Sequence, residues 1–197
     1  MYKQASPPPS TFAHHAVQRA IVVGIAGSGK TTFAQHLAVA FGLCHAELDA
    51  LYWDAQWMPA PTEVFRERVR FRLQSASRWV IDGNYSRTRD LTWPLANTIL
   101  WLDYSLPRIL WQLWWRTWQR IGMRQVLWNG NRETFHSQFL DRNSLFRYVI
   151  HNYRRKQVIY HSLFADPTYA HAQRLRFTRP ATAALWLHEQ SQESNKA

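Results

Sequence analysis

The stretch VVGIAGSGKTTFAQHL, residues 22–37, constrains the fold of this chain more than any other part of it. A short β-branched run ends in a glycine-rich turn, and an amphipathic segment follows. Gly24, Gly29, Lys30 and Thr31 fit the pattern G-x-x-x-x-G-K-[ST] between a predicted strand and a predicted helix. Glycines let backbone N–H groups approach phosphates without a Cβ in the way, and the helix N-terminus adds its positive dipole end. The sequence therefore predicts a loop that binds a nucleoside triphosphate.

Each part of this loop has an expected role. Lys30 would reach the β- and γ-phosphates and act in catalysis, while the Thr31 hydroxyl would hold Mg²⁺. ATP and Mg²⁺ are therefore the expected cofactors. The residues expected to contact the nucleotide are Gly24, Ala26, Gly27, Ser28, Gly29, Lys30, Thr31 and Thr32. The glycines do not follow the G-x-G-x-x-G spacing, so a dinucleotide-binding fold fits less well.

Composition narrows the class of protein further. The chain has 197 residues, 46% hydrophobic and 19% charged, as expected of one globular domain. Its net charge is +11, and arginine, which suits phosphate oxygens, supplies 20 of the 24 basic residues. No lysine-rich tail indicates a dedicated DNA-binding arm, so nucleic acid is a less favoured partner than a small molecule. With one cysteine, Cys44, no apparent secretory leader and no long apolar stretch, we expect a cytoplasmic protein without a membrane partner.

Strand and helix patterns alternate along most of the chain. We expect residues 1–18 to be a flexible extension, 19–190 a single domain and 191–197 a flexible tail. Predicted strands lie at 19–25, from 44 onward, and at 78–84, 97–105 and 173–179. Predicted helices lie at 30–42, 62–76, 106–122, 144–164 and 181–189. This alternation predicts an α/β fold in three layers, in which helices cover both faces of a parallel sheet of about five strands.

Three aspartates fall where predicted strands end, which is where ligands bind in open α/β sheets. Asp82 follows the apolar run WVI and suits a carboxylate that holds Mg²⁺ directly or through water. Asp49, beyond the second strand, could accept the proton of an acceptor hydroxyl, or a hydrogen bond from it. For Asp103 we favour a structural role in the turn.

Several short motifs resemble those of known phosphate-loop proteins. The string IDGNYS, residues 81–86, resembles the DGFPR turn of adenylate kinases. The combination of GSGKTT, LDALYW, WVIDGNYS and WNGNRE is still more similar to a bacterial group of adenylate-kinase-like proteins, often called topology modulation proteins. The resemblance covers roughly residues 20–187. It implies a P-loop NTPase fold with strand order 2-3-1-4-5, ATP at the first loop and a helical lid at about 116–135.

We also expect an acceptor site on the same edge of the sheet, although the acceptor region of adenylate kinases carries no LDALYW sequence and their AMP specificity does not carry over. The residues expected there are Asp49, Trp53, Asp82, Asn84, Tyr85, Arg87 and Arg89. Ser86 stands where adenylate kinases carry an arginine, so Arg87 and Arg89 are both candidates for the phosphate contact. Trp53 and Trp57 could stack a base or nucleoside, or pack their own loop.

The segment expected to form the lid is rich in arginine and tryptophan. Arg116, Arg120 and Arg124 recur every four residues, and Arg132 follows in the GNRE motif. Arginines of a lid neutralise the transferring phosphoryl group, so these four are catalytic candidates; a solvated helix face is the alternative. We expect four tryptophans of the same helix to surround it and to pack in the core or against a partner, which disfavours a membrane-lying helix: Trp111, Trp114, Trp115 and Trp118.

The leading hypothesis is an adenylate-kinase-like phosphotransferase that moves the γ-phosphoryl of ATP to a nucleotide, a nucleoside or another small hydroxyl compound. Asp49 favours the hydroxyl compound, because a phosphate acceptor needs no base. The alternative is a regulatory or DNA-associated nucleotide-binding protein that lacks kinase activity. The net charge supports this alternative.

Overall fold

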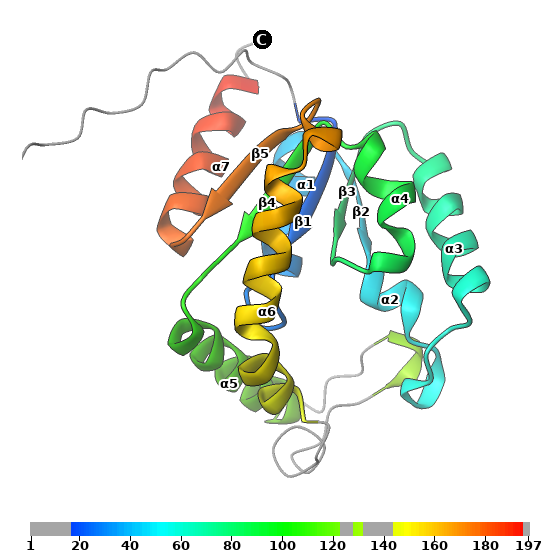
Figure 1. Ribbon diagram of the computed structural model, residues 1–197, viewed down its shortest axis with the longest axis vertical. Coiled ribbons are helices and arrows are strands. Elements are labelled where there is room, and N and C mark those ends of the chain that lie inside the picture. Colours follow the sequence, from blue (N-terminus) through cyan, green and yellow to red (C-terminus); the bar gives the residue numbers. More distant parts are fainter. Residues whose placement is uncertain (1–16, 123–127, 132–143, 195–197) are drawn as a thin grey trace, which may run out of the picture.

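A single parallel sheet organises the chain. The computed structural model describes residues 17–122, 128–131 and 144–194 (Figure 1). The strands are β1 (Arg19–Val23), β2 (Cys44–Glu47), β3 (Trp79–Asp82), β4 (Thr98–Leu102) and β5 (Gln173–Phe177). All neighbours are parallel and the order is β2-β3-β1-β4-β5, which confirms the predicted fold class and strand order.

Seven helices of the described chain flank the sheet or extend beyond its edge (Figure 1). Their bounds are α1 (Lys30–Phe41), α2 (Leu48–Tyr52), α3 (Thr62–Gln74), α4 (Arg89–Thr92), α5 (Leu106–Gly122), α6 (Leu145–Ala165) and α7 (Pro180–Ser194). Two boundaries differ from those expected. Val17 is buried, so packing begins before residue 19, and α7 continues to Ser194.

The alternation of side chains along the strands divides the core into two layers. In β1, Val22 packs in the cluster formed with α1 and α7, whereas Ile21 and Val23 pack in the cluster that includes α3. In β4, Leu100 and Trp101 divide between the two clusters in the same way. Both faces of the central strands are thus buried, which explains why these strands are continuous apolar runs.

The register of the sheet places the strand ends level with one another. Val22 lies opposite Asp82, and Asp82 in turn lies opposite Glu47. The turns that follow these strands therefore meet at one edge of the sheet, where α2 and α5 begin (Figure 1). In the described part of the chain, no helix is both long and apolar enough to cross a membrane.

Asp103, directly after β4, has a structural partner rather than a place in the candidate site. Its Oδ2 accepts hydrogen bonds from the guanidinium of Arg176 on β5, with Nη2 at 2.5 Å, and its Oδ1 accepts one from Gln157 on α6. The same guanidinium lies 4.8 Å from the centroid of the Trp101 ring. The carboxylate is buried, so these contacts compensate for its desolvation and join β4, β5 and α6.

Replacing Arg176 with methionine tests whether the contacts of Asp103 stabilise the packing of β4, β5 and α6. The substitution keeps most of the side-chain volume but leaves the buried Asp103 carboxylate without its cation. We expect the free energy of unfolding to fall by about 1–3 kcal/mol in urea denaturation. Arg70→Met, at an exposed position of α3, should change it by less than about 0.5 kcal/mol. Equal effects of the two substitutions would contradict the structural role of Asp103.

Candidate functional site

The phosphate loop, residues 24–31, has a backbone that side chains other than glycine would disturb. A Cβ at Gly24 would lie 2.4 Å from the Ser28 Oγ and 3.0 Å from the Leu102 carbonyl oxygen. Gly27 has a φ of +83°, and a Cβ there would lie 3.1 Å from the Cβ of Leu113 on α5. The close approach at Gly27 also shows that α5 packs directly against the loop.

The loop contains a buried polar atom that suits an anion. The Ser28 Oγ is buried and has no hydrogen-bond partner among the residues that the structure describes. Buried hydroxyls without a partner are uncommon, because each costs desolvation free energy. Gly29, with a φ of +83°, caps the N-terminus of α1, so the first free N–H groups of the helix point toward the same place.

Asp82 ties this loop to the sheet. Its Oδ2 accepts a hydrogen bond of 2.5 Å from the Thr31 hydroxyl, and its Oδ1 lies 2.8 Å from Nε2 of His45 on β2. The carboxylate is almost fully buried. A hydroxyl and a carboxylate held together are ligands that Mg²⁺ accepts, so the pair fits the expected ion. Asp82, also expected among the acceptor-binding residues, lies here on the phosphate-loop side.

Asp49 belongs to a second polar cluster. It lies in the first turn of α2, just after β2 ends. Its Oδ1 accepts a hydrogen bond of 2.5 Å from the Tyr85 hydroxyl. Burial raises the pKa of Tyr85 above its usual range, and the Asp49 carboxylate raises it further. Burial, and then the Asp49 charge, also raises the pKa of Tyr148 on α6. Tyr85 is therefore a neutral donor that holds one oxygen of the Asp49 carboxylate.

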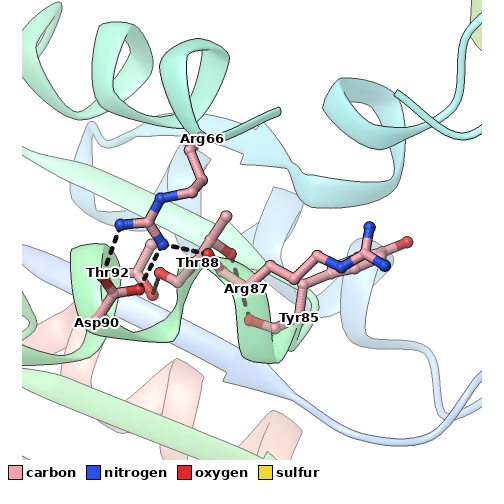
Figure 2. Close-up of polar contacts among 6 residues, drawn as sticks. All are labelled: Arg66, Tyr85, Arg87, Thr88, Asp90 and Thr92. Carbon is pink, nitrogen blue, oxygen red and sulfur yellow. Dashed lines mark hydrogen bonds and ion pairs between the residues drawn. The ribbon is translucent and has the colours of Figure 1, made fainter. Parts of the chain in front are cut away.

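The turn after β3 separates the two arginine candidates. Arg89 is half-buried and donates from its Nε to the Asn84 Oδ1 at 3.3 Å. Arg87 is exposed, and only its carbonyl oxygen takes part in the network that Figure 2 shows, where it accepts from Arg66. Arg66 also forms a two-bond ion pair with Asp90 at 2.7 and 2.9 Å. The side chain of Arg87 points away from that pair (Figure 2). Because Arg89 is half-buried and Arg87 is exposed, Arg89 is the better placed of the two for a buried ligand.

Side chains of α6 lie near the phosphate loop, Asp49 and Arg89. The Tyr160 hydroxyl donates to the Gly24 carbonyl oxygen at 3.4 Å, and Tyr148 lies near Asp49. Between these tyrosines, half-buried Lys156 lies close enough to three cations for their charges to affect it: Arg89, Arg155 and Lys30. Burial lowers the pKa of Lys156, and the three cations lower it further. Lys156 is thus close enough to Lys30 of the phosphate loop, and to Arg89, for their charges to act on it, and positive charge of this kind suits a polyphosphate.

The tryptophan loop, residues 53–58, is fastened to the segment 128–131. The Asn129 amide donates to the Trp53 carbonyl oxygen at 2.6 Å. Asn131 accepts from the Trp57 N–H and donates to the Asp54 carbonyl oxygen, both at 2.9 Å. The loop is strained, since Gln56 and Trp57 have φ values of 59° and 56°. Trp53 packs edge-on against Trp57 and Tyr52, so its ring takes part in packing of the loop.

Of the four arginines expected in the lid, two lie in the part of the chain that the structure describes and two do not. Arg116 and Arg120 are half-buried on α5, the helix that packs against the phosphate loop through Leu113. Arg124 and Arg132 lie outside the described residues, as does much of the expected lid at 116–135.

A surface hollow of about 560 Å³ opens beside the phosphate loop. Its lining includes Gly29 of the loop, side chains of α1 and α7 such as Phe33 and His188, and residues at the end of β4 and on α5. The hollow is continuous with the N-terminus of α1. It therefore offers room for the nucleoside part of a nucleotide whose phosphates occupy the loop.

The sequence pattern does not indicate several residues of this site. Tyr148, Arg155 and Lys156 belong to a helix 120 residues away from the loop, and nothing in their spacing indicates a site. His45 precedes the LDALYW motif by three positions and carried no signal of its own. The strand pattern at 44–47 could have found His45, because alternate residues of β2 face the same side as Asp82.

No family model and no curated protein sequence matches the chain. Among solved structures, a shikimate kinase from Acinetobacter baumannii, in complex with shikimate, aligns with a TM-score of 0.50 at 18% identity, over 91% of this chain and 95% of that one. A sugar kinase from Janibacter sp. gives 0.45 at 18% over 90% and 92%, and a shikimate kinase from Bacteroides thetaiotaomicron gives 0.47 at 14% over 91% and 99%. The likeness to the Acinetobacter enzyme shows that the two chains share a fold.

Replacing Lys156 with methionine should lower the affinity for MgATP without lowering the stability of the fold. Because neighbouring cations repel Lys156, we expect the urea midpoint of the variant to equal or exceed that of the wild type. Its affinity for MgATP should fall about 10–100-fold, the usual effect of a lost charge-assisted hydrogen bond. The exposed neighbour Arg154→Met is the control for ATP binding. A stable variant with unchanged ATP affinity would remove Lys156 from the site.

Replacing Asn131 with alanine should loosen the tryptophan loop. Two hydrogen bonds are lost and the Trp57 N–H loses its partner, so the free energy of unfolding should fall by about 1–3 kcal/mol. Asn152→Ala, which removes a hydrogen bond within α6, is the matched control and should cost less than about 1 kcal/mol. If the two variants unfold at the same urea concentration, Asn131 does not fasten the loop.

Proposed function

We propose that this protein is an ATP-dependent phosphotransferase whose acceptor is a small molecule with a hydroxyl group. The observation that carries the proposal is the position of Asp49. One of its oxygens is held by Tyr85, and α6 connects it to the phosphate loop through Tyr148 and Lys156. A carboxylate held in this way beside a polyphosphate site is suited to accept a proton.

The triphosphate would occupy the phosphate loop. Its backbone N–H groups, Lys30 and the buried Ser28 hydroxyl would contact phosphate oxygens. Lys156, Arg89 and Arg155 would add positive charge from the other side, and the lid candidates Arg116 and Arg120 would do so from α5. The adenosine would extend into the hollow between α1 and α7. These contacts neutralise the charge that repels an incoming nucleophile.

Thr31 and Asp82 would hold Mg²⁺, which withdraws charge from the phosphate oxygens when bound. His45 contacts the other carboxylate oxygen of Asp82 and would fix its orientation toward the hydroxyl of Thr31. The two ligands come from α1 and β3, so the hydrogen bond between them keeps both at the mouth of the loop.

In the transfer step, the acceptor oxygen attacks the γ-phosphorus and forms a new P–O bond. The bond from that phosphorus to the β,γ-bridging oxygen breaks, and ADP leaves with the electron pair. The proton of the acceptor hydroxyl moves to the free oxygen of Asp49. Catalysis therefore consists of positioning and charge neutralisation, with one proton transfer.

The resemblance to topology modulation proteins, and the adenylate-kinase-like DGNYS turn, support nucleotide chemistry at this site but do not define the acceptor. Trp53 and Asn84, with Asp49 and Arg89, bound the region where the acceptor would bind. Asn84 also lies close to Tyr160, which supports a polar acceptor pocket between the turn after β3 and α6. A hydroxyl compound that also carries an anionic group would satisfy both Asp49 and Arg89.

An acceptor screen tests the proposal. Mg²⁺-dependent ADP release would be measured against sugars, hydroxy acids, nucleosides and nucleoside monophosphates, with mass spectrometry of the product. We expect release stimulated by a hydroxyl acceptor, abolished in Lys30→Ala. In Asp49→Asn, kcat should fall about 10²–10⁴-fold with little change in ATP affinity, because only the base is lost.

Asp166→Asn, at an exposed aspartate that caps a turn far along the chain, is the matched control and should keep full activity. Full activity of Asp49→Asn would refute the role of Asp49 as base. ATP binding without stimulation by any acceptor would favour the regulatory, non-transferring alternative over a kinase.

A further inference from the structure

Helix α5 carries an exposed stripe of four tryptophans that the candidate site does not use. Trp111, Trp114, Trp115 and Trp118 are 61%, 39%, 54% and 53% exposed. By contrast, the described residues Trp79, Trp93 and Trp101 are almost fully buried. Large aromatic side chains gathered at one exposed place are uncommon in proteins without a partner surface.

The expectation that these tryptophans surround the helix was wrong, and of the two kinds of packing expected, in the core or against a partner, the structure excludes the core. Their spacing is i, i+3, i+4 and i+7, which confines them to roughly 100° of the helix circumference. Ile109, Leu113 and Thr117 are buried and occupy the opposite side. The buried side of α5 thus packs against the phosphate loop, and the tryptophans lie on the exposed side of the helix.

The charge around this stripe has one sign. Helices α5 and α6 contain seven basic and no acidic residues, and they pack against each other. The whole segment 104–165 has ten basic and two acidic residues, a balance of +8 out of the chain's +11. Arg108, exposed at the start of α5, flanks the stripe.

We propose that the tryptophan stripe of α5 docks this protein on an anionic lipid surface, with α5 lying in the plane of the membrane interface. Tryptophan is enriched at that depth because its ring is apolar and its N–H remains in contact with polar groups. Arg108 beside the stripe, and the wider excess of positive charge on the segment 104–165, attract anionic headgroups. This inference does not depend on the proposed kinase activity.

Two other occupants fit the stripe less well. A second copy of the chain would bring two surfaces of the same strong positive charge together. Single-stranded nucleic acid requires cations interleaved with the rings, whereas Arg116 and Arg120 lie toward the buried side of the helix and are half-buried. A flat anionic surface matches both the convex stripe and the charge.

Sedimentation with vesicles tests the proposal. The full chain would be mixed with phosphatidylcholine vesicles, and with vesicles in which a third of the lipid is phosphatidylglycerol. We expect binding to the anionic vesicles, weakened by salt, and little binding to the neutral ones. The triple variant Trp111→Gln, Trp115→Gln, Trp118→Gln should partition about tenfold or more weakly into anionic vesicles, because apolar contact area is lost.

The matched control removes three exposed apolar side chains from other helices. Val39→Gln, Phe71→Gln and Leu185→Gln, at positions 86%, 70% and 57% exposed, should bind vesicles as the wild type does. Circular dichroism checks that both triple variants are folded. Quenching of wild-type tryptophan fluorescence by brominated anionic lipid is a second measurement, which needs no variant.

Several results would overturn the proposal. Absence of binding to anionic vesicles, or absence of quenching by brominated lipid, would do so directly. Equal binding by the folded tryptophan variant would show that charge alone acts. A dimer in light scattering that the tryptophan variant abolishes would assign the stripe to a second copy. Tryptophan-dependent binding to an oligothymidine without vesicle binding would assign it to nucleic acid.

Discussion

The rest of this structure depends on the close approach of backbone segments around Gly24. The absence of a Cβ lets the loop fold back on the Ser28 side chain and on the carbonyl of Leu102, at the end of the neighbouring strand. Tyr160 of α6 then reaches the Gly24 carbonyl, and α5 packs against Gly27. Three elements that lie far apart in sequence therefore meet at one short turn, and the groups that they carry meet there too.

Convergence of positive charge is the main electrostatic feature of the molecule. Burial lowers the pKa of Lys156, and the charges of Arg89, Arg155 and Lys30 lower it further, so the charged form of this lysine is disfavoured in the free protein. Such an arrangement costs stability unless an anion occupies the centre. The buried hydroxyl of Ser28 without a partner has the same implication. The structure thus holds, in its free form, the unfavourable groups that a bound polyphosphate would stabilise.

Helix α5 has two faces with separate surroundings. One face packs on the phosphate loop through Leu113 and carries half-buried arginines, and the other presents the tryptophan stripe. One helix therefore carries both the side chains that pack on the loop and the exposed aromatic surface.

The sequence by itself determined the phosphate loop, the alternation of strands and helices, and the edge of the sheet where the aspartates lie. These features are local, because glycine conformation, a strand run and a helix start depend on a few adjacent residues. The resemblance to adenylate-kinase-like proteins supplied the strand order, which local pattern does not encode. Only the tertiary structure decided that Asp103 pairs with Arg176, that Lys156 is half-buried, and which side of α5 the tryptophans occupy. Each of these depends on how distant elements are oriented against one another, and that orientation is fixed by packing across the whole core rather than by spacing along the chain.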